Sequence, residues 1–518
     1  MDKSPPKIDL RFLLLLSVVS GLYAYWTWNR ELAGLGGDNA VYLLTAQNFS
    51  FWLPHSSVAK HFADHSQYPP LYPIMLALFG GGKSILAAHL LTSVFLLLAL
   101  VTMRTWLRIN GLTSMTADLA FLLIAFLPGT LKNSMFIMSE NLYMLLSLFV
   151  LLLVSLSEKK KNGLPLPAAA VIAAAAALTR TAGISLVGAF CLYLLLKRPR
   201  NSLLCGFLVL TPFPVYLLLK RTQAVEHVSY LDALISHYGN NTVAKIIEQF
   251  QKESLFLWQG WFSNYEAGLA GAFIGLLLFL CLIAFAIRLY QRKLDSLYLL
   301  FYFLIILLWP YPAEAKRLIY AVLPIMVGQG VLLLNLIPSF SIGKMKIMPV
   351  SLFVLAILVV SLPGTIFIAE RFLRPLPPDL EQFRRTKFLY SSNEHLAHSN
   401  LHHNSILIGD LKSLNDTLPK DAIIYGIKPA IISFYSRRLS LLPSTAGIFA
   451  DSGQFSQNRL RPEFFYMMGL TSPSVRKPFY PLDEIKDRVE IIHVARTGTG
   501  ADSPLITILA RLKPASQP

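Results

Sequence analysis

The stretch SENLYMLLSLFVLLLVSLSEKKK, from Ser139 to Lys161, decides the fold. It holds an apolar run over residues 140–157, and a helix of about 20 apolar residues crosses the ~30 Å hydrocarbon core of a bilayer. Glu140 opens the run, whereas the basic residues Lys159 to Lys161 close it. Because the cytoplasmic ends of membrane helices carry an excess of lysine and arginine, the run is predicted to be a transmembrane helix with its lysines in the cytoplasm.

The composition of the whole chain agrees with a membrane protein. Of 518 residues, 54% are hydrophobic and only 14% are charged, whereas about a quarter of the residues in a soluble domain are charged. The net charge of +17 lies largely in short loops between apolar runs, where it indicates orientation in a bilayer and not a nucleic-acid partner. Cys191, Cys205 and Cys281 all fall in apolar stretches, so neither a disulfide framework nor a zinc site is predicted.

About eleven apolar runs have the length and composition of membrane helices. A basic flank without a small-residue cleavage site makes the first run a retained signal anchor, which keeps the amino terminus in the cytoplasm. Alternation from there makes every inner loop basic, as the positive-inside rule requires. The predicted spans are 10–28, 84–103, 113–128, 140–157, 164–179, 181–197, 202–219, 267–288, 296–310, 318–337 and 348–368.

The sequence therefore predicts an α-helical polytopic membrane protein with a membrane module over residues 1–369. An odd number of spans places residues 370–518 outside the cytoplasm, where short β-like runs between turn residues predict a small soluble α/β domain. These runs are AIIYG from Ala422, EIIHVA from Glu490 and LITILA from Leu505. The module has two long outer loops, 29–83 and 220–266. Within the first loop, the stretch from Tyr68 to Gly81 is apolar but too short to span, and it is predicted to form a juxtamembrane half-helix.

Ionisable side chains from several loops are predicted to gather at the outer face. Asp38 and Tyr42 share one face of a helical stretch, while Glu140, Arg180 and the Lys316–Arg317 pair lie at the outer ends of other spans. Together they suit a phosphate-bearing lipid, because guanidinium groups pair with phosphate oxygens. The alternatives are that Asp38 only caps a helix and that each charged residue snorkels to the interface.

Two further clusters in the outer loops have both a functional and a structural interpretation. His61 and His65, four residues apart, would hold a divalent cation if a third ligand joined them, but a polar loop under the lipid headgroups is favoured. The aromatic residues at the end of the second outer loop are predicted to form an interfacial belt, with sugar stacking as the minor alternative. These residues are Trp258, Trp261, Phe262 and Tyr265.

The order of motifs along the chain resembles the C-type glycosyltransferases, and most closely their family 39 branch. The branch includes protein O-mannosyltransferases and the lipid A aminoarabinose transferase. The resemblance covers residues 10–340 and suggests a bacterial origin, although the β-trefoil of eukaryotic protein mannosyltransferases is missing from the sequence. The motifs that carry it are GGDNAVYLLTAQNF, YPPLYPIMLALFG, SENLYMLLSLFVLLL, ALTRTAG and KRLIYAVLP.

This resemblance implies an inverting transfer of a sugar from a polyprenyl-phosphate donor to an extracytoplasmic lipid, glycan or protein. It implies that Asp38 is the catalytic base. Arg180, Arg317 and Lys316 are predicted to bind the donor phosphate, and Tyr42, Glu140 and Tyr68 to line the sugar or acceptor pocket. Glu140 would either bind sugar hydroxyls or orient Arg180. The expected location is the cytoplasmic (inner) membrane, with the active site on the outer side and membrane lipids around the spans. No cofactor is required, and a divalent cation is left open.

Two other functions compete with this interpretation. A transporter or flippase of lipid-linked sugars would use the same lipid, but transporters place ionisable and helix-breaking residues at the midplane, whereas these residues gather at one face. A structural membrane subunit would need Asp38 only as a cap. The identity of the sugar and of the acceptor depends on the shape of the pocket, which the sequence does not reveal.

Overall fold

The computed structural model is mostly helical and divides into two compact units. The first unit comprises residues 1–28, 67–75 and 86–373, and the second comprises residues 29–66, 76–85 and 374–518. The described residues are 9–160, 165–221, 247–248, 269–309, 314–342, 345–390, 394–441, 463–469, 489–498 and 503–513. Most of the second predicted outer loop lies outside them, as do Trp258, Trp261, Phe262 and Tyr265.

The first unit is a bundle of apolar helices. Apolar side chains surround most of these helices, because a bilayer does not demand a polar outer face. Its helices are α1 (Leu10–Trp26), α5 (Ile85–Ile109), α6 (Ser114–Phe126), α7 (Pro128–Ser134), α8 (Glu140–Lys160), α9 (Pro165–Ala177), the 3₁₀ turn η1 (Thr181–Gly183), α10 (Ile184–Lys197), α11 (Pro199–Leu210), α12 (Pro212–Arg221), α15 (Leu269–Tyr290), α16 (Leu294–Leu307), α17 (Ala315–Tyr320), α18 (Leu323–Leu334) and α19 (Pro349–Leu373). A hairpin of β1 (Phe340–Ile342) and β2 (Met345–Ile347) precedes α19.

All eleven predicted spans coincide with helices. Among the described residues, four helices are long and apolar enough to cross a membrane, or up to six if each of two bent pairs counts as one span. The total of about eleven crossings therefore stays a prediction. The run 318–337, predicted as one span, is divided into α17 and α18, and Pro324 lies at the start of α18. Proline lacks the N–H that a continuous helix would use, so it is favoured in the first turn of a helix.

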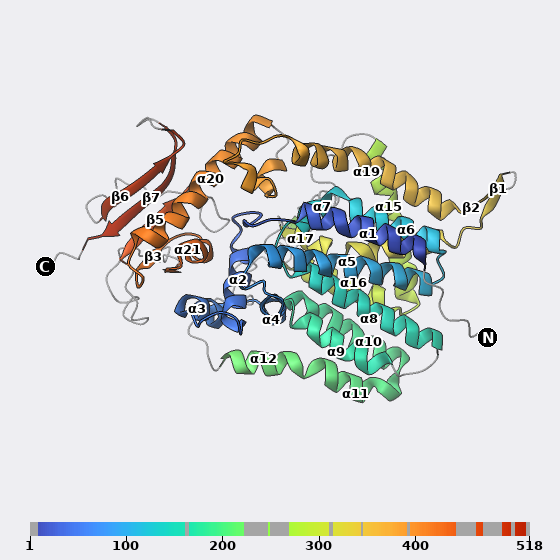
Figure 1. The fold of residues 1–518 in the computed structure, drawn as a ribbon. Helices are drawn as coiled ribbons and strands as arrows, with labels where there is room; N and C mark the ends of the chain where they lie inside the picture. The colour runs from blue at the N-terminus through green and yellow to red at the C-terminus, as the bar shows by residue number, and fades with distance from the viewer. Residues whose placement is uncertain are drawn as a thin grey trace. The chain divides into compact units, whose positions relative to one another are not determined.

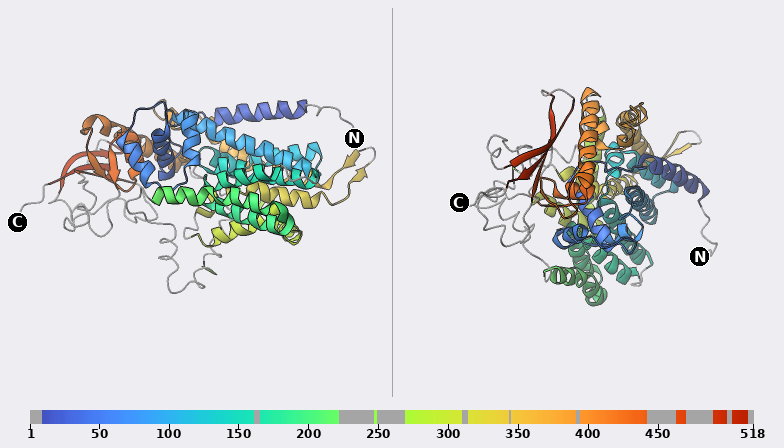
Figure 2. Two further views of the ribbon diagram at one scale, coloured as in Figure 1. Left: turned by 90° about the horizontal axis from the view of Figure 1, so that it is seen from below. Right: turned by 60° about the vertical axis from the view of Figure 1, so that its left-hand side comes forward.

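Small residues allow close packing in the bundle. Helix α9 is largely alanine and packs between α8, α10 and α11 (Figures 1 and 2). A Cβ on Gly328 of α18 would lie 2.5 Å from Cζ3 of Trp106 in α5, so only glycine fits there. The polar groups of buried aromatic side chains donate to main-chain oxygens. The hydroxyl of Tyr23 donates to the carbonyl oxygen of Ala125 at 2.6 Å, and the indole N–H of Trp26 donates to that of Leu131 at 3.1 Å.

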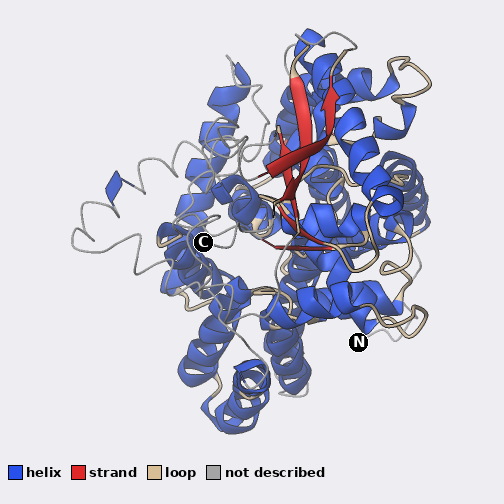
Figure 3. Ribbon diagram, turned by 90° about the vertical axis from the view of Figure 1, so that its left-hand side faces the viewer, coloured by secondary structure: helices blue, strands red, loops and turns tan. Residues whose placement is uncertain are grey.

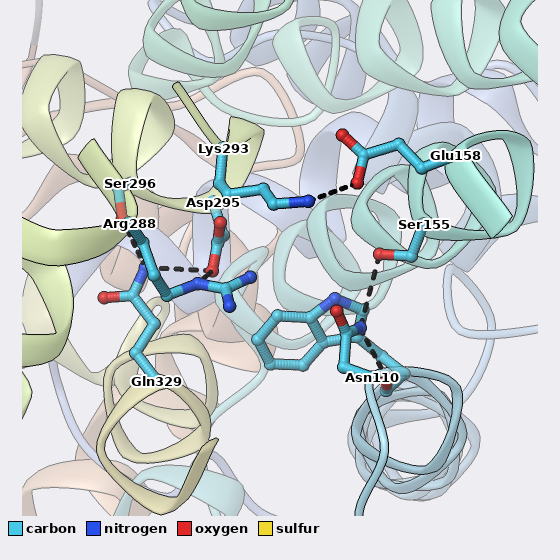
Figure 4. Close-up of polar contacts among 9 residues, drawn as sticks. Asn110, Ser155, Glu158, Arg288, Lys293, Asp295, Ser296 and Gln329 are labelled. Carbon is cyan, nitrogen blue, oxygen red and sulfur yellow. Dashed lines mark hydrogen bonds and ion pairs between the residues drawn. The ribbon is translucent and has the colours of Figure 1, made fainter. Parts of the chain in front are cut away.

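Ion pairs join the helix ends that the sequence assigns to the cytoplasm. Lys293 contacts Glu158 at 2.6 Å, and Arg288 contacts the buried carboxylate of Asp295 at 2.5 Å, which also accepts from Gln329 (Figure 4). Arg104 likewise lies between two carboxylates. The basic residues that define the predicted orientation therefore also connect neighbouring helices.

The second unit combines the start of the first outer loop with the carboxy-terminal region. Its helices are α2 (Gly37–Phe49), α3 (Ser57–His65), the 3₁₀ turns η4 (Glu381–Phe383) and η5 (Lys387–Tyr390), α20 (Glu394–Thr417) and α21 (Pro429–Ser436). Helix α4 (Leu71–Leu78) is divided between the two units and coincides with the predicted half-helix.

A five-stranded mixed sheet completes the second unit (Figure 3). The strands are β3 (Ile423–Tyr425), β4 (Leu439–Leu441), β5 (Phe464–Met468), β6 (Val489–Arg496) and β7 (Leu505–Leu512), in the order β4-β3-β5-β7-β6. Three of them, β3, β6 and β7, are the β-like runs predicted from the sequence. Helix α20 packs on this sheet, where its buried Asp410 accepts from the hydroxyls of Tyr466 at 2.5 Å and Thr507 at 2.6 Å and contacts His493 at 2.8 Å.

This division differs from the two consecutive parts, 1–369 and 370–518, predicted from the sequence. The later boundary nearly coincides, since the second unit resumes at Arg374, but residues 29–66 group with the carboxy-terminal region. Contacts between residues so far apart in the chain depend on tertiary packing and leave no local pattern in the sequence.

Candidate active site

Three of the predicted site residues meet in the first unit. One oxygen of the Glu140 carboxylate, Oε1, lies 2.7 Å from Nη1 of Arg180 and 2.8 Å from Nε of Arg317. The side chain of Glu140 is 3% exposed, that of Arg180 is 11% exposed and that of Arg317 is 24% exposed. Two guanidinium groups thus meet at one buried carboxylate, and Arg317 also lies 4.0 Å from the carboxylate of Glu314. Guanidinium groups of this kind can pair with phosphate oxygens.

Local structure explains how each residue of this cluster is positioned. Glu140 is the first residue of α8, where a carboxylate interacts favourably with the helix dipole. Arg180 has an extended backbone in the turn between α9 and α10, and its guanidinium also donates to the hydroxyl of Ser139 at 3.1 Å. Arg317 belongs to the short helix α17. The chain thus brings three distant segments together at one point.

A small pocket adjoins the cluster. It has about 190 Å³ of empty space and is lined by Asn133, Phe136, Met138, Glu140, Asn141, Arg317 and Tyr320. The hydroxyl of Tyr320 donates to the Asn141 side chain at 2.7 Å, and the Asn141 amide donates to the main chain of Thr92 at 3.1 Å. The pocket is narrow, so a sugar phosphate can enter only if these side chains move apart.

Asn133, Asn141 and Tyr320 were not identified from the sequence as site residues. Asn141 directly follows Glu140 and Tyr320 lies in the KRLIYAVLP motif, so both stood beside residues that were selected. A search for polar residues close in sequence to the selected charged residues would have found Asn141 and Tyr320.

Asp38 and Tyr42 lie in helix α2 of the second unit. The N-cap is Gly36 and makes no side-chain hydrogen bond, so Asp38 lies in the first helical turn and does not occupy the cap position. Asp38 is half-buried and Tyr42 is buried. A carboxylate in the first turn still interacts with the helix dipole, but the simplest structural alternative for Asp38, that of an N-cap, is not what the helix shows.

The carboxy-terminal region places one lysine near Asp38, Lys428, that the sequence did not single out. Helix α21 packs against α2 and is preceded by Lys428. Burial lowers the pKa of Lys428, and the charge of Asp38 opposes this shift. The ammonium group of Lys428 and the carboxylate of Asp38 are therefore close enough to interact electrostatically.

The remaining predicted site residues occupy separate places. Tyr68 belongs to the first unit, where its main-chain oxygen accepts from the hydroxyl of Tyr216 at 3.3 Å. The side chain of Lys316 lies outside the described residues, although its backbone is part of α17. The structure therefore unites Glu140, Arg180 and Arg317, and it places Asp38 and Tyr42 on one helix. That the two groups meet stays a prediction.

The histidine pair of α3 does not form a metal site by itself. The rings of His61 and His65 stack with their centroids 4.1 Å apart, and burial lowers the pKa of His61 to about 4. Within the described part of the chain, no three His, Cys, Asp or Glu side chains gather around a point where a metal ion could bind.

The comparisons with known proteins agree on one fold. Residues 67–312 match the model of glycosyltransferase family 87. ArnT from Cupriavidus metallidurans, solved bound to undecaprenyl phosphate, aligns over 97% of this chain and 98% of its own with 13% identity and a TM-score of 0.53. The Archaeoglobus fulgidus oligosaccharyltransferase in its apo form aligns over 89% and 69% with 13% identity and a TM-score of 0.51. No curated protein sequence matches.

The resemblance found in the sequence is thereby confirmed at the level of the fold, and the family model that matches part of the chain is that of glycosyltransferase family 87. At 13% identity the solved structures establish the fold alone. The protein has the fold of the C-type membrane glycosyltransferases.

Proposed function

We propose that this protein transfers a sugar from a polyprenyl-phosphate donor to a hydroxyl or amine of an acceptor outside the cytoplasm. The observation that carries the proposal is the contact of Glu140 with both Arg180 and Arg317, which holds two guanidinium groups at one point, with Arg317 lining a small pocket. The fold match supports it, because ArnT of the same fold was solved with undecaprenyl phosphate bound.

The two arginines would bind the donor phosphate and stabilise the charge that develops on it. An acceptor oxygen or nitrogen attacks the anomeric carbon, the bond from that carbon to the phosphate oxygen breaks, and the polyprenyl phosphate leaves with the electron pair. Phosphate is a good leaving group, so fixed cations aid its departure more than a proton donor would. In-line attack inverts the configuration at the anomeric carbon.

Asp38 would accept the proton that the acceptor loses. A positioned general base contributes about 10²- to 10⁴-fold to the rate. Its carboxylate lies in the first turn of α2 and does not occupy the cap position. We further propose that the site opens at the outer face of the cytoplasmic membrane, with the amino terminus inside, as the basic inner loops indicate.

Mass spectrometry of the envelope tests this function. A strain that lacks the protein should lose one sugar from a glycolipid, glycan or protein, and expression of the wild-type chain should restore it. Asp38→Asn should accumulate in the membrane and fail to restore the sugar, whereas Asp64→Asn, a change of the same kind in helix α3, should restore it. Full restoration by Asp38→Asn would reject the assigned base, and an unchanged envelope in the deletion strain would reject the transfer.

A further inference from the structure

The segment that leads into helix α2 has little stiffness of its own. Residues 29–36 form neither helix nor strand, and glycines stand at positions 34, 36 and 37, directly before Asp38. Glycine has the widest backbone freedom of any residue, and the N-cap Gly36 offers no side chain to fix the first turn. The position of Asp38 must therefore be set by contacts from elsewhere in the second unit.

Glu31 supplies two of these contacts. It is 5% exposed, its Oε1 lies 2.5 Å from Nζ of Lys412 in α20, and its Oε2 accepts from the hydroxyl of Tyr435 in α21 at 3.2 Å. Burial and the nearby carboxylate raise the pKa of Tyr435, so its hydroxyl keeps the proton that it donates. A buried carboxylate is costly unless it is paired and hydrogen-bonded, and both of its oxygens are used here.

Two further hydrogen bonds fix the same segment to the carboxy-terminal region. The side-chain amide of Asn29 donates to the main chain of Arg385 at 2.9 Å, and the main-chain N–H of Lys387 donates to Ala33 at 2.8 Å. Helix α2 itself packs on α21, the helix that carries Tyr435. The segment is thus held at three points before Asp38 and at one helix face after it.

We propose that Glu31, Lys412 and Tyr435 are positioning residues for Asp38, so that the carboxy-terminal region completes the catalytic centre by fixing the start of α2. This inference rests on the proposed function, in which Asp38 is the base. A displacement of about 1 Å at a reacting group can reduce the rate about 100-fold. Loss of the contact should therefore lower the turnover rate while the affinity for donor, which depends on the arginines, stays unchanged.

Two measurements on the full-length protein in nanodiscs test the inference. The first is hydrogen exchange of peptides that cover residues 34–44, and the second is the initial rate of transfer of radiolabelled polyprenyl-phosphate sugars, extracted from the host, into membranes of the deletion strain. Glu31→Gln, Lys412→Met and Tyr435→Phe should each speed exchange in this peptide and lower the maximal rate about 10- to 100-fold with an unchanged donor KM. Lys420→Met, which changes an exposed lysine of the same region, should alter neither.

A charge exchange separates positioning from a general structural role. Glu31→Lys alone should lower the transfer rate more than any of the other changes. Combining it with Lys412→Glu should recover part of the lost rate and slow the hydrogen exchange again. If Glu31 variants fail to accumulate, Lys412→Met still tests the contact, because Lys412 is half-exposed. The inference would be overturned if Lys412→Met and Tyr435→Phe showed the hydrogen exchange and the transfer rate of the wild type while Asp38→Asn was inactive. An active Asp38→Asn would instead overturn the proposed base.

Discussion

At the scale of single residues, the sequence identified the charged groups but not their contacts. Glu140, Arg180 and Arg317 were predicted to share one level of the membrane, because each lies at the outer end of a predicted span. The structure adds that a single carboxylate contacts both guanidinium groups. Which residue pairs with which depends on the packing of α8, α9 and α17, and no local pattern encodes it.

Replacing Arg317 should weaken binding of the donor. Arg317→Gln removes one of the two guanidinium groups that contact Glu140, so we expect the Kd for polyprenyl phosphate to rise about tenfold. The rise should be larger if the phosphate is bound through two parallel hydrogen bonds. Arg317→Lys should recover only part of the affinity, because lysine lacks the planar fork. Arg200→Gln, an exposed arginine of α11, is the control and should bind as the wild type does. Equal affinity in all three variants would contradict the assigned site.

Glu140→Gln distinguishes a carboxylate that orients the arginines from one that only neutralises them. If Glu140 orients them, its loss weakens donor binding although the pocket becomes more positive. Simple neutralisation predicts tighter binding of the phosphate. We expect weaker binding together with a loss of about 3–5 kcal/mol of stability, as for other broken buried ion pairs. Titration with polyprenyl phosphate and thermal unfolding in detergent give the two quantities.

At the scale of helices and strands, the hydrophobic pattern predicted where the helices lie in the sequence better than it predicted whether each helix is continuous. Every predicted span is helical, and three of the strands follow the predicted β-like runs. The single run 318–337 is instead two helices, with Pro324 at the start of the second. An apolar run shows where the chain avoids water, but the path of the backbone within the run depends on proline and on neighbouring helices.

The contact between α5 and α18 gives a prediction for a pair of glycines. Gly328→Ala places a Cβ 2.5 Å from the ring of Trp106, so we expect a loss of about 1–3 kcal/mol of stability through overpacking. Gly206→Ala, in the middle of α11, meets nothing within 4 Å and should be neutral or gain up to about 1 kcal/mol from better helix propensity. Thermal unfolding of both variants in the same detergent measures the difference. A stable Gly328→Ala would contradict the close packing.

At the scale of the whole molecule, the order of motifs along the chain predicted the fold of the C-type glycosyltransferases. The motifs most resemble the family 39 branch, and the family model that matches residues 67–312 is that of family 87. The grouping of the first outer loop with the carboxy-terminal region was not foreseen, since Glu31 and Lys412 are separated by 381 positions in the chain. Distant contacts of this kind follow from the folded structure alone.

Labelling of introduced cysteines tests the proposed orientation. After Cys191, Cys205 and Cys281 are replaced by alanine, Lys420→Cys should react with a membrane-impermeant maleimide in spheroplasts. Arg108→Cys, at the predicted inner end of α5, should react only after the membrane is opened. The basic inner loops predict this asymmetry. The reverse order of labelling would invert the proposed topology and move the site to the cytoplasm.

The most direct measurement of the central claim separates binding of the lipid donor from transfer of its sugar. Two quantities are measured in nanodiscs, the affinity for polyprenyl phosphate and the rate of sugar transfer into membranes of the deletion strain. They are compared between the wild type, Asp38→Asn and Arg317→Gln. The account predicts that Asp38→Asn binds as the wild type does but transfers about 10²- to 10⁴-fold more slowly, and that Arg317→Gln binds weakly. Transfer at the wild-type rate by Asp38→Asn, or undiminished binding by Arg317→Gln, would contradict it.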